Sequence, residues 1–309
     1  MVKGRGVKEK NTGKLSENRA LSGGDRFFDI FIICIAAVAL VATLYPLIYV
    51  ISSSFSSPRD LMAGRVWLWP VNFTHEGYKV VLSYPRIWSG LYNSVIITVA
   101  GTLINLFVTI CAAYPLSRKD LKFRKPILMM FTFTILFSGG LIPSYLLVRN
   151  LGLYNTRWAL LIPNAMSIFN FMITRTFFAN NIPAELLESA KLDGCSDFRF
   201  LTKIVIPLSG AIIAVITLYY AVAHWNSYFN AILYISDRAK QPLQLVLREI
   251  LILNSTEQMM EGTTKADALY LAEQMKYSLI VLASLPLLIA YPFVQKYFVK
   301  GVMIGAVKG

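Results

Sequence analysis

The sequence predicts an all-α integral membrane protein with six transmembrane helices, and three observations support this fold class. Of its 309 residues, 56% are hydrophobic and only 15% are charged, whereas soluble domains carry about 25% charged residues. The charged residues are clustered, so long apolar runs lie between the clusters. Each run can cross about 30 Å of hydrocarbon as a helix, because a helix rises about 1.5 Å per residue.

The chain begins with a polar, basic segment, residues 1–26, which we expect to be partly disordered and to lie near an anionic membrane face. The apolar run after it extends for about 24 residues, too long for the core of a secretory signal. We therefore interpret this run as an uncleaved first span. The predicted spans cover residues 27–51, 89–114, 126–148, 157–178, 206–235 and 277–299.

The fourth and fifth spans are unusual. The fourth contains Pro163, Asn164 and Asn170, which predicts a helix that faces the bundle or a wet path rather than lipid. The fifth is overlong and ends in a polar and aromatic run, residues 224–230. We expect its last turns to lie at the membrane interface or beside a transport path.

The distribution of basic residues predicts the orientation. Five of the eleven residues in 115–125 are Lys or Arg, which is typical of a short cytoplasmic loop. This orientation puts both chain termini in the cytoplasm and the large loop 236–276 outside. The net charge of +13 then needs no nucleic-acid partner. Within the outer loop, 241–251 predicts an amphipathic helix and 266–277 a helix that leads into the last span.

A cytoplasmic stretch, residues 182–207, predicts a helix-turn-helix. Pro183 suits the first turn of a helix, because the N–H that proline lacks would be unbonded there. Gly194 suits a chain reversal with positive φ. Ser196 can cap the second helix. We also expect a local ion pair between Glu188 and Lys191, which are about one helical turn apart.

The same stretch resembles a known family. Glu188-Ser189-Ala190, Gly194 and Ile204-Val205-Ile206-Pro207 match, at every spacing, the pattern Glu-Ala-Ala, Gly, Ile-x-Leu-Pro of the coupling loop in permease subunits of binding-protein-dependent ABC importers. Ser189 replaces the first Ala of that pattern and Ile206 replaces its Leu. The C-terminal residues 301–309 resemble the tail of the carbohydrate-uptake branch, which is of the maltose or oligosaccharide type. The resemblance covers about residues 27–309.

This resemblance implies a permease domain, residues 27–299, followed by a cytoplasmic tail, residues 300–309. The implied ATPase-coupling residues are Glu188, Ser189, Ala190, Asp193, Gly194 and Pro207, with Ala190 facing a cleft on the ATPase. In the tail, Gly305, Val307 and Lys308 are implied to contact the ATPase. The implied protein partners are a second, homologous permease, an ABC ATPase dimer that holds ATP and Mg, and an extracellular solute-binding protein or lipoprotein. The implied substrate is a carbohydrate, namely a complex oligosaccharide. The resemblance also implies contact with membrane lipid, at the bacterial plasma membrane.

For the substrate pathway we single out amide and aromatic residues near span ends: Asn170, Phe171, Trp225, Asn226 and Tyr228. The alternative is that these residues hold helices together. No catalytic or metal-ligating set and no phosphate-binding loop is recognisable, so we predict neither an enzyme nor a cofactor bound by this chain. A self-sufficient secondary transporter or channel is the rival function. It lacks an ionisable residue near a span centre and leaves the coupling stretch unexplained.

Overall fold

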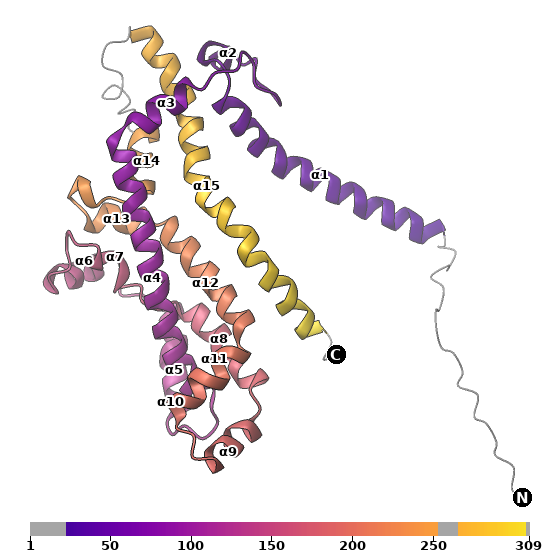
Figure 1. Ribbon diagram of the computed structural model, residues 1–309, viewed down its shortest axis with the longest axis vertical. Helices are drawn as coiled ribbons and strands as arrows, with labels where there is room; N and C mark the ends of the chain where they lie inside the picture. Colours follow the sequence, from indigo (N-terminus) through magenta and orange to yellow (C-terminus); the bar gives the residue numbers. More distant parts are fainter. Residues whose placement is uncertain (1–22, 253–264, 307–309) are drawn as a thin grey trace, which may run out of the picture. The chain divides into compact units, whose positions relative to one another are not determined.

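The computed structural model describes residues 23–252 and 265–306, and the regular elements in these ranges are helices (Figure 1). The chain divides between Tyr49 and Val50 into two compact units. The first unit holds most of α1 (Gly23–Ser54), whose apolar side chains are exposed along its length, as expected of a helix that has lipid as its solvent.

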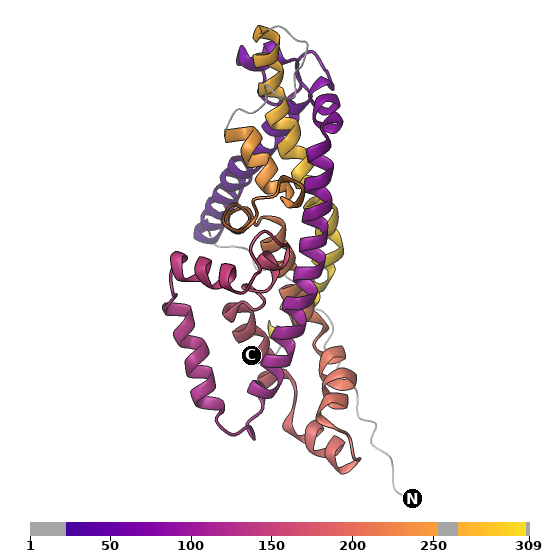
Figure 2. The same ribbon diagram turned by 90° about the vertical axis from the view of Figure 1, so that its left-hand side faces the viewer.

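The second unit is a bundle in which α12 packs against both α4 and α15 (Figures 1 and 2). Its elements are α2 (Pro58–Met62), α3 (Glu76–Ser83), α4 (Pro85–Ser117), α5 (Arg124–Leu136), α6 (Leu141–Asn150), α7 (Trp158–Leu161), α8 (Ile168–Asn181), α9 (Ala184–Leu192), α10 (Asp197–Phe200), the π-helical turn η1 (Leu201–Val205), α11 (Ile206–Leu208), α12 (Gly210–Trp225), α13 (Phe229–Tyr234), the 3-10 turn η2 (Arg238–Lys240), α14 (Leu243–Ile252) and α15 (Lys265–Ala306).

By length and apolar composition, three helical segments of the described residues can cross a membrane: Phe27–Ser54, Pro85–Ser117 and Tyr270–Pro292. Two bent pairs raise the number to five if each pair is one span. The pair of α5 and α6 bends by 114°, and the pair Asp197–Leu208 and Gly210–Trp225 bends by 84°. Two predicted spans, 126–148 and 206–235, are therefore broken helices.

The predicted fourth span, 157–178, does not form one long helix, because α7 ends at Leu161 and α8 begins at Ile168. Pro163 accounts for the break, since proline lacks a donor and disfavours helical backbone in the residue before it. Neighbouring helices satisfy the freed backbone groups. Asn105 Nδ2 donates to the carbonyl of Asn164 at 2.6 Å, and the Ser167 N–H donates to Tyr220 Oη at 3.1 Å.

The core of the second unit consists of three apolar clusters along α4. One joins α3, α4, α14 and α15, a second joins the last turns of α4 to α8, α10 and α12, and a third joins the middle of α4 to α7 and α13. α4 and α12 approach closely where Gly101 faces His224. A Cβ on Gly101 would lie 2.4 Å from His224 Nε2, so this position needs glycine.

Both helices predicted within residues 236–276 are confirmed. The amphipathic segment 241–251 forms α14, and 266–277 is the start of α15, which continues without interruption into the last predicted span. The N-terminus of α14 is fixed on α4, where Ser94 Oγ accepts from the Leu243 N–H at 2.8 Å and Asn93 Nδ2 donates to the Gln241 carbonyl at 3.0 Å.

Candidate functional site: a cavity and a coupling stretch

The second unit contains a cavity of about 420 Å³ between the end of α12, α14 and α15. Trp225, Asn226 and Tyr228 line it from the turn after α12. α14 contributes Gln244, Leu247, Arg248 and Leu251, and α15 contributes Ile280, Ala283, Ser284 and Leu287. The volume is within the usual range of ligand pockets, about 300–1,000 Å³. The lining combines an apolar wall with a few polar groups, as such pockets commonly do.

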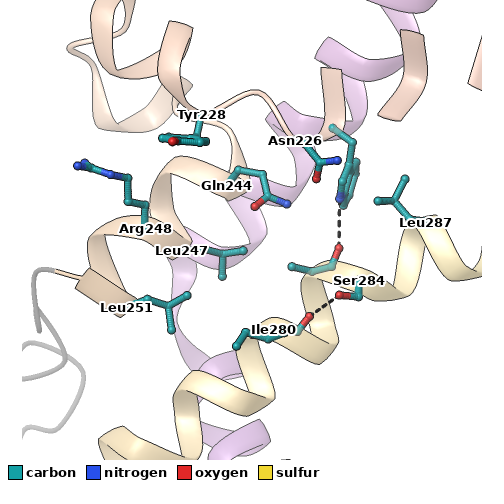
Figure 3. Close-up of a pocket in the computed structure, with 11 residues that line it drawn as sticks. Asn226, Tyr228, Gln244, Leu247, Arg248, Leu251, Ile280, Ser284 and Leu287 are labelled. Carbon is teal, nitrogen blue, oxygen red and sulfur yellow. Dashed lines mark hydrogen bonds between the residues drawn. The ribbon is translucent and has the colours of Figure 1, made fainter. Parts of the chain in front are cut away.

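The polar side chains of the cavity come from three elements, one of which is α15, with Ser284 (Figure 3). Asn226 and Tyr228 lie on the turn after α12, and Gln244 and Arg248 are one helical turn apart on α14. Tyr228 is 46% exposed, whereas Trp225 is only 4% exposed and donates from Nε1 to the Ala283 carbonyl at 3.1 Å. Trp225 therefore forms the wall that joins α12 to α15, and Tyr228 presents its ring at the surface of the cavity.

A second candidate site is the stretch that contains α9 and α10. Gly194 has φ of +72°, and its N–H donates to the Lys191 carbonyl at 3.1 Å. Ser196 Oγ accepts from the Arg199 N–H at the start of α10. The predicted helix-turn-helix is therefore confirmed, with a glycine cap on the first helix and a serine cap on the second.

Large apolar side chains are exposed on this helix-turn-helix. Leu192 is 90% exposed and Phe198 is 74% exposed. Ala190, by contrast, is only 9% exposed and packs in the chain's own core, in the cluster that contains Phe200. The expectation that Ala190 faces outward is therefore not met. The small side chain of Ala190 lets α9 lie close to the bundle, and the exposed apolar surface comes from Leu192 and Phe198 instead.

An arginine at the end of α4 ties the helix-turn-helix to the bundle. Arg118 donates to Asp120 at 2.9 Å from Nε and to Asp197 Oδ1 on α10 at 2.6 Å. Its hydrogen bond is the main reason that the pKa of Asp120 is lowered to about 2. Lys191 on α9 lies 3.7 Å from Asp120 Oδ2 and pairs with that carboxylate. The expected ion pair between Glu188 and Lys191 is therefore wrong.

Known proteins were compared with the chain. No family model matches the sequence. The chain is 41% identical over 285 residues to the polygalacturonan/rhamnogalacturonan transport system permease protein YtcP of Bacillus subtilis (strain 168), covering 92% of this chain and 99% of that protein. It is 43% identical over 284 residues to protein LplC of the same organism, covering 92% and 96%. The chain is also 30% identical to the probable ABC transporter permease protein YurM of the same organism, covering 87% of this chain and 85% of that protein. The chain belongs to the family of ABC transporter permeases.

A solved structure supports this assignment. The permease is similar to a chain in the crystal structure of a bacterial ABC transporter involved in the import of the acidic polysaccharide alginate. The TM-score is 0.82 at 33% sequence identity, and the match covers 90% of this chain and 98% of that chain. The all-helical fold and the multi-pass membrane character of the permease follow from these likenesses and from its apolar helices.

The permease brings together only some of the predicted pathway residues. Trp225, Asn226 and Tyr228 line the cavity. Asn170 and Phe171 do not line it, because they lie in α8 and are buried in the core, where Phe171 packs edge-on against Phe131 with the ring centroids 4.8 Å apart. Phe171 therefore holds helices together, as the alternative interpretation has it, and a pathway role for Asn170 stays a prediction.

The predicted coupling residues of the permease lie together on and around the helix-turn-helix. Glu188, Ser189, Asp193, Gly194 and Pro207 are all exposed, whereas Ala190 is buried. Of the predicted tail residues, Gly305 lies in α15. Val307 and Lys308 lie outside the described residues.

Sequence reasoning missed the contribution of α14 to the cavity and the role of Arg118. Gln244 and Arg248 are spaced i, i+4 within the amphipathic segment, so they lie on one helix face, next to Leu247 and Leu251, which line the same cavity. That spacing is a signal for a polar stripe directed at a cavity. The contact from Arg118 to Asp197 joins residues 79 positions apart, so no local pattern could indicate it.

Proposed function

We propose that this permease is one of two transmembrane subunits of an ATP-driven importer that moves a complex oligosaccharide across the bacterial plasma membrane by alternating access. The chain crosses the membrane six times, with both termini and the helix-turn-helix in the cytoplasm. Broken spans 126–148, 157–178 and 206–235 count as single crossings in this topology, because protein or a wet cavity can surround irregular backbone at membrane depth.

The observation that carries the proposal is the helix-turn-helix at the end of α4. It exposes Leu192 and Phe198 beside the turn at Gly194, and it is attached to the bundle through Arg118. An exposed apolar surface of this kind is suited to a protein partner. We assign that partner as the ABC ATPase dimer, which binds ATP and Mg and does the hydrolysis.

The cavity supports a carbohydrate as substrate. Sugars offer hydroxyl groups to amides such as Asn226 and Gln244, and they offer apolar ring faces to aromatic side chains such as Tyr228. Of the proteins named above, YtcP is a permease of a polygalacturonan/rhamnogalacturonan transport system, and the solved structure is of a transporter involved in the import of alginate, so both are linked to polymers of sugars. A second permease encloses the path, and an extracellular solute-binding protein delivers the oligosaccharide.

Substitution of Gly194 tests this function. In the assembled importer in proteoliposomes, we expect Gly194→Val to abolish substrate-stimulated ATP hydrolysis and uptake, because a side chain at φ of +72° costs about 1–2 kcal/mol and misaligns the two helices. Gly64→Val is the matched control, because Gly64 has φ of +68° and open space around it but lies in the loop after α2. Normal stimulation by Gly194→Val in an assembled complex would contradict the proposal.

A further inference from the structure

The cavity contains a charged group that a neutral sugar does not need. Among its lining residues Arg248 is the one with a charged side chain, and within residues 23–252 and 265–306 it has no ion pair. A guanidinium holds its charge at any physiological pH, and its planar donors match the geometry of a carboxylate. At the edge of a cavity that holds amides and an aromatic ring, this group is a site for an anion.

A second arginine in the same region shows what a structural role looks like. Arg86, at the start of α4, donates to Glu249 Oε2 at 2.7 Å and to Gln241 Oε1 at 2.8 Å. It joins α4 to α14 and does not line the cavity. Arg86 therefore joins two helices, whereas Arg248 on α14 lines the cavity.

We propose that the cavity binds an acidic sugar, a uronate, and that Arg248 receives its carboxylate. Gln244, one turn before Arg248 on α14, and Asn226, on the turn after α12, bind hydroxyl groups of the oligosaccharide. Tyr228 packs against an apolar ring face. The inference rests on the proposed import function and adds the charge of the substrate, which makes Arg248 the residue that determines specificity.

The test measures binding of two probes to the assembled importer in lipid nanodiscs by equilibrium dialysis, without the solute-binding protein. The probes are trigalacturonate and its fully methyl-esterified form, which keeps the rings and hydroxyl groups but has no charge. We expect the wild type to prefer trigalacturonate by roughly tenfold or more, since a hydrogen bond to a charged group is worth at least that much. Arg248→Gln should remove the preference while it binds the ester normally, and Arg248→Lys should keep part of it.

Arg238→Gln is the matched control, because Arg238 lies in η2, between α13 and α14, but does not line the cavity. It should leave the preference unchanged. Three results would overturn the proposal: no preference in the wild type, a preference that survives in Arg248→Gln, or an equal loss of both probes in that variant. A different result would contradict the proposed function, namely an assembled importer that takes up no sugar. Import of a neutral sugar with no preference for charge would contradict only the role of Arg248.

Discussion

The helix-turn-helix, which we propose as the coupling element, and the cavity lie near opposite ends of α4 (Figures 1 and 2). Different interactions hold each of them to the bundle. At the coupling end, Arg118 joins two exposed carboxylates, Asp120 and Asp197. At the cavity end, Asn93 and Ser94 bind the backbone before and at the start of α14, and Trp225 binds the backbone of α15. The ion pair of Arg86 and Glu249, which also joins α4 to α14, is mostly buried.

This difference predicts which kind of substitution should affect each end. Exposed ion pairs are individually weak and are screened by salt, so they can break and form again when a partner moves the segment that they hold. Buried neutral hydrogen bonds and packed rings depend on shape instead. We therefore expect added salt and substitutions of exposed charges to act mainly at the end with Arg118, and size substitutions to act mainly at the cavity end and in the middle of α4.

The largest effect should follow from a size change between the two ends. Gly101→Ala places a Cβ 2.4 Å from His224 Nε2 and disturbs its 2.7 Å hydrogen bond to Asn105 Oδ1. Overpacking and the loss of this bond together should cost roughly 2–4 kcal/mol. Thermal unfolding in detergent measures the loss. Gly210→Ala is the control, with open space around its Cβ, and its stability should stay the same or rise.

A smaller effect is expected at the cavity. Tyr228→Ala removes an exposed ring, so it should lower oligosaccharide uptake by roughly tenfold, the value of about 1–2 kcal/mol for a lost aromatic contact. Unfolding temperature should stay unchanged, because the ring is 46% exposed. Tyr228→Phe keeps the ring and should transport nearly normally. A loss of complex assembly with Tyr228→Ala would mean that the ring holds helices together.

At the coupling end, Arg118→Ala should uncouple without unfolding. Removing the contacts to Asp120 and Asp197 should cost about 1 kcal/mol, because both carboxylates are more than half exposed. Substrate-stimulated ATP hydrolysis should fall severalfold. Arg118→Lys should restore only part of it, since lysine lacks the planar donors. Lys122→Ala, on the same loop, is the control. If added salt does not narrow the gap between Arg118→Ala and wild type, the electrostatic explanation fails.

The smallest effect belongs to Lys191. Its ammonium lies 3.7 Å from Asp120, and both side chains are about half exposed. Lys191→Ala should therefore change the free energy of unfolding by less than about 0.5 kcal/mol, because exposed ion pairs contribute little to stability. It should also leave ATP hydrolysis within about twofold of wild type. A large loss of stimulation with no loss of stability would instead reveal a direct contact with the ATPase.

Local chemistry explains what could be predicted from the sequence. Three features depend on residues close together in the chain and could therefore be predicted: the cap at Ser196, the turn at Gly194 and the amphipathic segment 241–251. The helix breaks were legible only in part. Pro163 indicated an irregular fourth span, but the bend between α5 and α6 involves Gly139 and Gly140, which a hydropathy profile treats as part of one apolar run.

Long-range packing explains what could not be predicted. Whether Ala190 faces a partner or its own core depends on how α9 lies against Phe200, and a nine-residue helix can bury either face. Phe171 and Tyr228 are both aromatic residues near span ends, yet one is buried and the other is exposed. Composition alone cannot separate them, because the difference arises from neighbours such as Phe131 that are distant in sequence.

The unbroken length of α4 has a mechanical consequence. Its 33 residues make a rod about 50 Å long, at about 1.5 Å per residue. Asn93 fastens one end to the backbone before α14, and Arg118 fastens the other to α10. A lever arm of that length, pivoting by about 5° near one end, sweeps the other end through about 4 Å. A displacement of that size exceeds the reach of a hydrogen bond, so a slight tilt driven at the coupling end is enough to open or close contacts around the cavity.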